Sequence, residues 1–290
     1  MTRSTQARSR RAFDPVRLGP WGLLGLLGLG GVSCAAPSID ESWADHDPSN
    51  AERLDHSDWQ ALLDAYLITD DPSGVNLVDY SRLKANPADQ QRLAGYIDYL
   101  RGLDPRQYAR DVQMAYWINL YNAVTLRVVL DEYPVESIKD IHEGLIPNTG
   151  PWGDVHAMVA GQPLTLDNIE HDILRRIWQD NRIHYGVNCA SISCPNLAPE
   201  AYTAENLERL LDQGARDYVN HPRGAELLDE AFGVVSSIYY WYHEDFGNSD
   251  AGVLEHLRKY AEGDLAEQLR DFDGSLDHEY DWNLNAPRTP

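Results

Sequence analysis

One segment, residues 112–130, constrains the fold of this chain more than any other. It reads VQMAYWINLYNAVTLRVVL and would be apolar on nearly all sides of a helix. Its nineteen residues approach the length of a membrane span, but polar side chains interrupt it at Asn119, Asn122 and Arg127. The pattern therefore predicts a buried central helix.

Asn119 and Asn122 lie three residues apart, so they share one face of that helix. A buried amide without partners costs about 1–3 kcal/mol, so this face must meet other polar groups. Two alternatives stay open: the amides cap neighbouring backbone, or they line a functional site.

Shorter elements are predicted on both sides of the central helix from hydrophobic periodicity and turn residues. One predicted helix begins at Asp58 as its N-cap, and another runs from Asp167 as cap through Trp178. Three more helices are predicted over Pro87–Leu103, Thr203–Val219 and Gly252–Tyr260. Extended segments are predicted over Val75–Tyr80, His156–Val159 and Ile183–Val187, and Val234–Tyr242 fits either a strand or a helix. These elements indicate an α+β fold, a mainly helical single domain over residues 58–290 with a small sheet.

The charge of the chain limits its partners. Its 46 acidic residues against 24 basic ones give a formal net charge of −22. So acidic a surface repels nucleic acid and anionic membranes. We therefore expect a small-molecule or peptide substrate, no nucleic acid, and membrane contact only through an N-terminal lipid anchor. Nothing in the sequence indicates an oligomeric state.

Residues 1–34 have the features of an export signal: a basic leader, an apolar run too short to span a bilayer, and small residues ending at Cys34. The sequence Gly31-Val32-Ser33-Cys34 resembles a bacterial lipobox, with Gly31 where leucine is usual. Lipidation of Cys34 is expected, with plain signal-peptidase cleavage nearby as the alternative. The polar, acidic residues 35–57 are predicted to be a linker. The protein is thus expected to be exported and lipid-anchored, facing the periplasm or the outer face.

The stretch RIHYGVNCASISCPNL, residues 182–197, contains both remaining cysteines. In an oxidising compartment Cys189 and Cys194 would ordinarily form a disulfide. A bridge needs Cα atoms roughly 4.4–6.8 Å apart, whereas five extended residues cover about 16 Å, so the chain must turn tightly between them. The alternatives are that Cys189 is a nucleophile or that both are buried, inert thiols.

A nucleophilic cysteine requires a histidine, a group that orients the histidine, and hydrogen-bond donors. The candidate catalytic residues are Cys189, His184, His171, Glu170 and Ser191, with Asn119 and Asn122 as polar lining. On a straight strand His184 and Cys189 would face opposite sides, so His184 reaches the thiol only if the chain turns at Asn188.

No metal or cofactor is predicted. The spacing of Glu170, His171, His184 and Cys189 matches no zinc finger or zincin. The sequence also lacks a phosphate loop, a dinucleotide fingerprint and an EF-hand.

Several motifs follow one another between residues 75 and 285. They are AYWINLYNA at 115–123, YP at 133–134 with SI at 137–138, PW at 151–152, LDNIEH at 166–171 with LR at 174–175, RIHYGVNCAS at 182–191 with SCP at 193–195, WY at 241–242 with DF at 245–246, and YDWNLN at 280–285. In these segments the chain resembles the bacterial and plant domain of unknown function 547. The resemblance implies a domain and a set of typical positions, but no reaction.

Two functional hypotheses follow from the residues themselves. The first is an exported cell-envelope enzyme, a Cys/His-dependent hydrolase or acyl or amide transferase. The second is a non-catalytic envelope module, for binding or structure, in which a Cys189–Cys194 disulfide and buried polar residues hold the fold.

Overall fold

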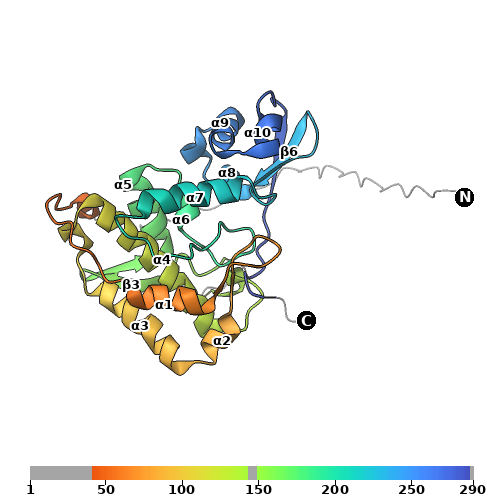
Figure 1. Ribbon diagram of the computed structural model, residues 1–290. Helices are drawn as coiled ribbons and strands as arrows, with labels where there is room; N and C mark the ends of the chain where they lie inside the picture. The colour runs from red at the N-terminus through yellow and green to blue at the C-terminus, as the bar shows by residue number, and fades with distance from the viewer. Residues whose placement is uncertain (1–40, 143–148, 288–290) are drawn as a thin grey trace, which may run out of the picture. The chain divides into compact units, whose positions relative to one another are not determined.

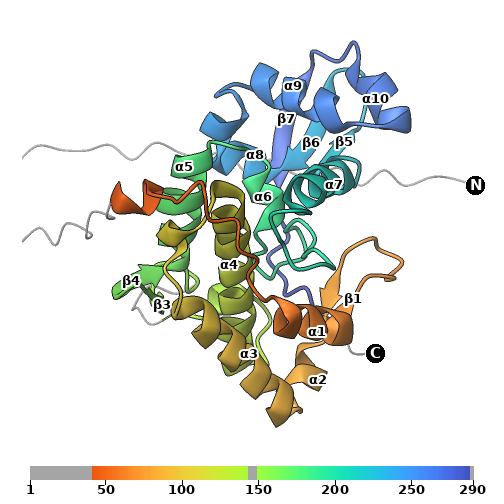
Figure 2. The ribbon, with the colours of Figure 1, turned by 60° about the vertical axis from the view of Figure 1, so that its left-hand side comes forward.

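The computed structural model describes residues 41–142 and 149–287 of the 290-residue chain. The predicted export signal and its Cys34 lie outside the described residues. Within the described part the fold is α+β and mainly helical, with three small sheets of two or three strands, as the sequence predicts (Figures 1 and 2). The sequence predicts one small sheet, whereas the described residues form three separate ones.

The first half of the described chain is built around the long helix α4 (Arg110–Glu132). Helix α3 packs along it, and α1 lies against α3, as Figure 2 shows. The elements before and after α4 are η1 (Glu41–Ala44), α1 (Ser57–Tyr66), β1 (Leu67–Ile68), β2 (Leu77–Val78), α2 (Tyr80–Lys84), α3 (Pro87–Arg101), η2 (Pro105–Gln107) and η3 (Ile138–Asp140).

Helix α4 is the buried central helix that the sequence predicts. Every residue from Val112 to Leu130 is buried except Arg127. No helix in the described part of the chain combines the length and apolar character that crossing a membrane requires. The helix instead forms the middle of the larger hydrophobic core, where Trp117, Leu120 and Val129 are fully enclosed.

A hairpin and a π-helix follow. Strands β3 (Val155–Val159) and β4 (Gln162–Thr165) pair antiparallel, and η4 (Asn168–Arg175) continues into α5 (Arg176–Trp178). The predicted cap Asp167 makes no side-chain cap hydrogen bond. Thr165 and Asn168 cap this start reciprocally instead: Thr165 Oγ1 accepts from the Asn168 N–H at 3.0 Å, and Asn168 Oδ1 accepts from the Thr165 N–H at 3.1 Å.

The strand predicted over Ile183–Val187 is wrong. Residues Ile183–Gly186 form a helical turn, α6. A short apolar run fits a buried strand or a buried helix equally well, and here a local turn favours the helix. The Asp180 carboxylate accepts a hydrogen bond from the Arg182 N–H at 2.9 Å, and the Asp180 carbonyl accepts one from the Ile183 N–H at 3.1 Å, so the chain turns directly before α6. His184 and Cys189 therefore do not lie on opposite faces of one strand, as the sequence predicts for a straight strand.

The remaining elements, drawn in teal and blue in Figures 1 and 2, enclose a second hydrophobic cluster. They are α7 (Leu207–Val219), β5 (Ala225–Leu227), β6 (Phe232–Ser236), α8 (Ser237–Trp241), η5 (His243–Phe246), α9 (Asp250–Tyr260), α10 (Gly263–Leu269) and β7 (Ser275–Glu279). The ambiguous segment Val234–Tyr242 contains both a strand end and a helix. The helix predicted as the last one, α9, is followed by α10 and by β7, which pairs parallel with β6. The helix predicted from Thr203 begins at Leu207, after a turn in which Thr203 Oγ1 accepts from the Asn206 N–H.

Residues 41–56 differ from the linker expected over 35–57. Trp43 is buried, with its ring 5.3 Å edge-on from that of Trp117 and the Arg106 guanidinium 5.1 Å from its ring centroid. Helix α1 then begins at Ser57, one residue before the predicted cap Asp58. This acidic stretch is therefore part of the folded domain, because one large aromatic side chain anchors it to the core.

Replacing Trp43 with alanine tests this anchoring. We expect Trp43→Ala to lower the free energy of unfolding by about 3–5 kcal/mol, since it removes a fully buried aromatic side chain. Urea denaturation followed by circular dichroism measures the change. The matched control is Leu228→Ala, whose side chain is 56% exposed and whose effect should stay within about 0.5 kcal/mol. A loss below about 1 kcal/mol for Trp43→Ala would show that residues 41–56 are not part of the cooperative fold.

Candidate functional site

The loop that carries both cysteines is attached to the central helix by one amide. Asn122 donates from Nδ2 to the Gly186 carbonyl at 2.9 Å and accepts at Oδ1 from the Asn188 N–H at 2.8 Å. Asn188 in turn donates to the Pro195 carbonyl and accepts from the Ala190 N–H. These bonds satisfy the buried amide and fix the path of the backbone at both ends of the loop.

The C-terminal segment closes the other side of this loop. The Ile192 N–H donates to the Asn283 carbonyl at 2.8 Å, and the Asn285 N–H donates to the Ala190 carbonyl at 3.1 Å. Ala190 has φ 60°, a left-handed conformation that is unfavourable for alanine and reverses the chain directly after Cys189. The turn that both hypotheses about the cysteines required is therefore present.

Cys189 and Cys194 are free thiols in the structure, so the disulfide, one of the three alternatives for these cysteines, is not formed in it. The two residues are nevertheless adjacent, because the Cys189 N–H donates to Cys194 Sγ at 2.9 Å. Cys194 is buried, and both burial and its hydrogen bond to Cys189 raise the pKa of its thiol well above the ordinary value.

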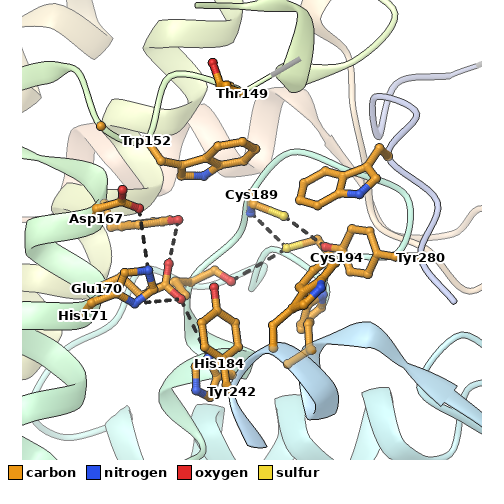
Figure 3. A pocket seen from close by; sticks show the side chains of 18 of the residues that line it. Thr149, Trp152, Asp167, Glu170, His171, His184, Cys189, Cys194, Tyr242 and Tyr280 are labelled. Atoms are coloured by element: carbon orange, nitrogen blue, oxygen red, sulfur yellow. Dashed lines mark hydrogen bonds and ion pairs between the residues drawn. The ribbon is translucent and has the colours of Figure 1, made fainter. Parts of the chain in front are cut away.

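The pKa of the Cys189 thiol is shifted in the opposite direction. A hydrogen bond from the Cys194 thiol, with further ones from Ser191 and Tyr280, lowers the pKa of Cys189 even though burial acts against it. Its Sγ lies 3.1 Å from the Tyr280 hydroxyl (Figure 3). Ser191 Oγ lies 3.3 Å from the same sulfur and 3.0 Å from the Tyr280 hydroxyl. Burial and the neighbouring Cys189 raise the pKa of Tyr280, so its hydroxyl stays neutral and able to donate. The arrangement favours a thiolate at Cys189 and a protonated thiol at Cys194.

A chain of acidic and imidazole groups forms another wall of the same site. His184 is almost fully buried, with Nε2 2.7 Å from Asp245 Oδ2 and Nδ1 3.7 Å from Glu170 Oε1. The buried Glu170 accepts at Oε2 from the Tyr121 hydroxyl at 2.9 Å. The ring of Tyr242 stacks on His184 with centroids 4.2 Å apart.

Asp245 is held ionised at the end of this chain. Burial alone would raise its pKa, but hydrogen bonds from His184 and Arg175 lower the pKa of Asp245 to about 2. Arg175 also pairs with Glu244 at 2.8 Å. Both nitrogens of His184 therefore face carboxylates, and this fixes the plane of its ring.

His171 is the more accessible histidine. Its side chain is 32% exposed, with Nε2 3.6 Å from Asp167 Oδ1 and Nδ1 4.0 Å from Glu170 Oε1. Burial raises the pKa of Asp167. Glu170 and His171 both lie on the π-helix η4, a type of turn often found at functional sites. Within the described residues neither histidine hydrogen-bonds to the Cys189 sulfur, so the direct Cys–His pair expected from the sequence is not present.

The two asparagines of α4 do not line the cavity. Asn122 lies behind the cysteine loop, as described above. Asn119 points elsewhere: its Nδ2 donates to the Tyr202 carbonyl at 2.7 Å and its Oδ1 accepts from the Tyr202 N–H at 3.0 Å. Of the two alternatives for these amides, the capping of neighbouring backbone is the one that the structure shows.

Four of the predicted residues, Cys189, His184, His171 and Glu170, line one cavity of about 950 Å³, and Ser191 touches the thiol from behind. The other lining residues are mostly aromatic or acidic. They include Tyr121, Trp152, Asp154, Asp167, Trp241, Tyr242, Tyr280 and Trp282. No group of His, Cys, Asp and Glu side chains within residues 41–142 and 149–287 is arranged to hold a metal ion.

Trp152 depends on a glycine next to it. Gly150 has φ 71°, and a Cβ atom placed there would lie 1.8 Å from the Trp152 ring. Only glycine therefore leaves room for this ring in its present position. The ring also lies edge-on to Trp282, with centroids 5.5 Å apart.

Comparison with known proteins agrees with these motifs. Residues 105–219 match the model of a family described as protein of unknown function, DUF547. This segment belongs to the DUF547 family. It contains α4, the π-helix with Glu170 and His171, and the cysteine loop, whereas Asp245 and Tyr280 lie beyond the matched DUF547 residues. No curated protein and no solved structure matches the chain.

Sequence reasoning missed the closest partners of the site residues. Tyr280 contacts the sulfur, Asp245 holds His184, and Tyr121 donates to Glu170. Tyr280 stands in the YDWNLN motif, and Tyr121 in the central helix. The motifs include these two tyrosines but do not show which residues they contact. The contact between Cys189 and Tyr280, for example, joins residues 91 positions apart in the sequence.

Alkylation of the thiols tests their assigned protonation. We expect iodoacetamide to modify Cys189 much faster than Cys194, with a pH midpoint below that of an ordinary thiol, because the lowered pKa leaves more thiolate near neutral pH. Tyr280→Phe removes a donor, so the midpoint should move up by about one pH unit and the rate at pH 7 should fall about five- to tenfold. Intact-mass kinetics over a pH series measure both.

The matched control for this substitution is Tyr240→Phe. Tyr240 is 63% exposed and stacks on His278, away from the thiol. A midpoint for Cys189 at or above that of a free thiol, or an equal shift in both tyrosine variants, would contradict the assigned hydrogen bonds.

Proposed function

We propose that this DUF547 chain is a cysteine-dependent hydrolase or acyl transferase. One observation carries the proposal: a thiol with lowered pKa, Cys189, opens into a large cavity that is also lined by the buried Glu170. A thiol in a purely structural role has no need of hydroxyl donors on its sulfur or of a cavity beside it.

The reaction would proceed in two steps. The Cys189 thiolate attacks a carbonyl carbon, a thioester bond forms, and the bond to the amine, alcohol or thiol leaving group breaks as that group takes a proton. Water or a second nucleophile then attacks the thioester, loses its proton, and returns Cys189 to the thiolate. The neutral Tyr280 hydroxyl, adjacent to the sulfur, is placed to stabilise the negative charge that moves from sulfur to the carbonyl oxygen.

Glu170 is assigned the transfer of protons, and His184 positions it. Both nitrogens of His184 face carboxylates, so this ring orients Glu170 rather than contacting the thiol. The Tyr121 hydroxyl holds the other carboxylate oxygen of Glu170. A substrate or water in the cavity would connect Glu170 with Cys189, since general acids and bases often complete their contacts only when substrate is bound.

The cellular setting is part of this proposal and is supported by the sequence alone. The basic leader, the apolar run and the lipobox-like ending at Cys34 favour an exported, lipid-anchored enzyme of the cell envelope that acts on a small-molecule or peptide substrate. The alternative, a non-catalytic module held by a Cys189–Cys194 bridge, is less well supported, because the two cysteines are thiols with opposite pKa shifts.

Trapping the acyl-enzyme tests the proposal. We expect p-nitrophenyl esters of short acids to acylate the wild-type protein once, at Cys189, as seen by intact mass and peptide mapping. Cys189→Ala should carry no adduct, whereas Glu170→Gln should form it and release it about 100-fold more slowly, since general acid–base catalysis contributes on this order. Rapid-quench mass spectrometry follows both steps.

Cys194→Ala and thermal melts serve as controls for this experiment. Cys194→Ala keeps the nucleophile, so it should still form the adduct, and equal melting temperatures would show that the other variants are folded. An adduct that forms equally well on Cys189→Ala, or a release rate unchanged in a folded Glu170→Gln protein, would refute the proposed roles.

A further inference from the structure

We propose that the cavity takes acyl substrates that carry a positively charged amine at a distance from the reacting carbonyl. This inference rests on the proposed acyl chemistry of Cys189 and names the class of substrate for it. Two independent observations support it: the charge of the lining residues and the aromatic rings beside those charges.

The lining is acidic and lacks permanent cations. Asp154, Asp167 and Glu170 line the cavity, and its described lining residues include no lysine or arginine. The nearby Arg175 is already paired with Glu244 and Asp245. A substrate with a carboxylate or phosphate would thus enter against three carboxylates, whereas an ammonium group would be attracted.

Two of these carboxylates have no Lys or Arg ion pair within the described part of the chain, namely Asp154 and Asp167. Glu170, in contrast, is held by Tyr121 and lies near His184. Burial raises the pKa of Asp167, and an ammonium group beside it would offset that cost. Asp154 and Asp167 are therefore the residues available to a cationic ligand.

Trp152 lines the same cavity as these two carboxylates and is tied to the backbone of both. It is two residues before Asp154, and its carbonyl accepts a hydrogen bond from the Asp167 N–H at 3.0 Å. An indole ring beside carboxylates attracts ammonium groups through its negative face. Two other rings that line the cavity already have such partners: Lys139 Nζ lies 5.0 Å from the Trp282 ring centroid, and the Arg175 guanidinium lies 4.8 Å from that of Tyr242.

The positions of Asp167 and Trp152 would hold the ammonium group of the substrate at a distance from the Cys189 thiol. Figure 3 shows Asp167 on one side of the cavity, Cys189 on the other, and Trp152 along the wall between them. A carbonyl at Cys189 and an ammonium group near Asp167 must therefore belong to different ends of one substrate. The apolar rings between them suit a hydrocarbon spacer.

Binding of three ligands of equal length tests this inference. The probes are hexylammonium, hexan-1-ol and hexanoate, titrated by calorimetry into the wild-type protein and into Cys189→Ala at low and high salt. We expect hexylammonium to bind about tenfold or more tightly than hexanol, hexanoate to bind most weakly, and the preference to fall with salt. Hexanol binding as tightly as hexylammonium, or hexanoate binding best, would overturn the inference.

Substitutions of the lining residues test which of them bind the ammonium group. Asp167→Asn and Asp154→Asn should each weaken hexylammonium about threefold or more and leave hexanol unchanged. Trp152→Phe should weaken hexylammonium binding less than either aspartate substitution does. The control Asp271→Asn changes an exposed carboxylate outside the cavity and should have no effect. If all three cavity variants bind hexylammonium as the wild type and the control do, Asp154, Asp167 and Trp152 do not form the site.

The outcome is separable from that of the proposed function. Because Cys189→Ala retains the carboxylates and the rings, it should bind hexylammonium as the wild type does. Selective ammonium binding without any acyl adduct on Cys189 would refute the enzyme but not the cation site. Acylation of Cys189 without ammonium preference would refute the cation site alone.

Discussion

The hydrogen bonds of one buried amide hold the candidate site together. Asn122 bonds on both sides to the backbone that leads into the cysteine loop, so the loop is fixed to the most buried helix of the fold. Because an unpaired amide in this core would cost about 1–3 kcal/mol, the helix and the loop stabilise each other's position. The reversal at Ala190 and the contact of Cys189 with Tyr280 both depend on that attachment.

The site combines two polar systems with different tasks. Around Cys189, hydroxyl and thiol hydrogens converge on sulfur and favour its negative form. Around His184, carboxylates and Arg175 hold an imidazole rigidly and leave Glu170 facing the cavity. In the proposed reaction a cavity separates the Cys189 thiol from Glu170, so a bound substrate would link the two groups, and the reaction would begin only once the cavity is filled.

Much of the fold and part of the site could be predicted from the sequence. Long amphipathic or wholly apolar runs such as Val112–Leu130 identified helices reliably, because many residues agree on one period. The strand predicted for the short run Ile183–Val187 was wrong, since its apolar residues fit two periods and the turn at Asp180 that precedes the helix has no apolar pattern. The cysteines, histidines and Glu170 were found by their chemistry. Tyr280, Asp245 and Trp152 were not, because their roles arise only from contacts between distant segments.

The last segment of the domain has a consequence for biosynthesis. The thiol at Cys189 is translated 91 residues before the Tyr280 hydroxyl that contacts it, and the backbone that closes its loop comes from Asn283 and Asn285. A nascent chain that has emerged only as far as β6 therefore carries its cysteines without these partners. The contribution of Tyr280 to the state of this thiol is therefore added only when the domain is complete, whereas that of Cys194 is available once the loop itself has formed.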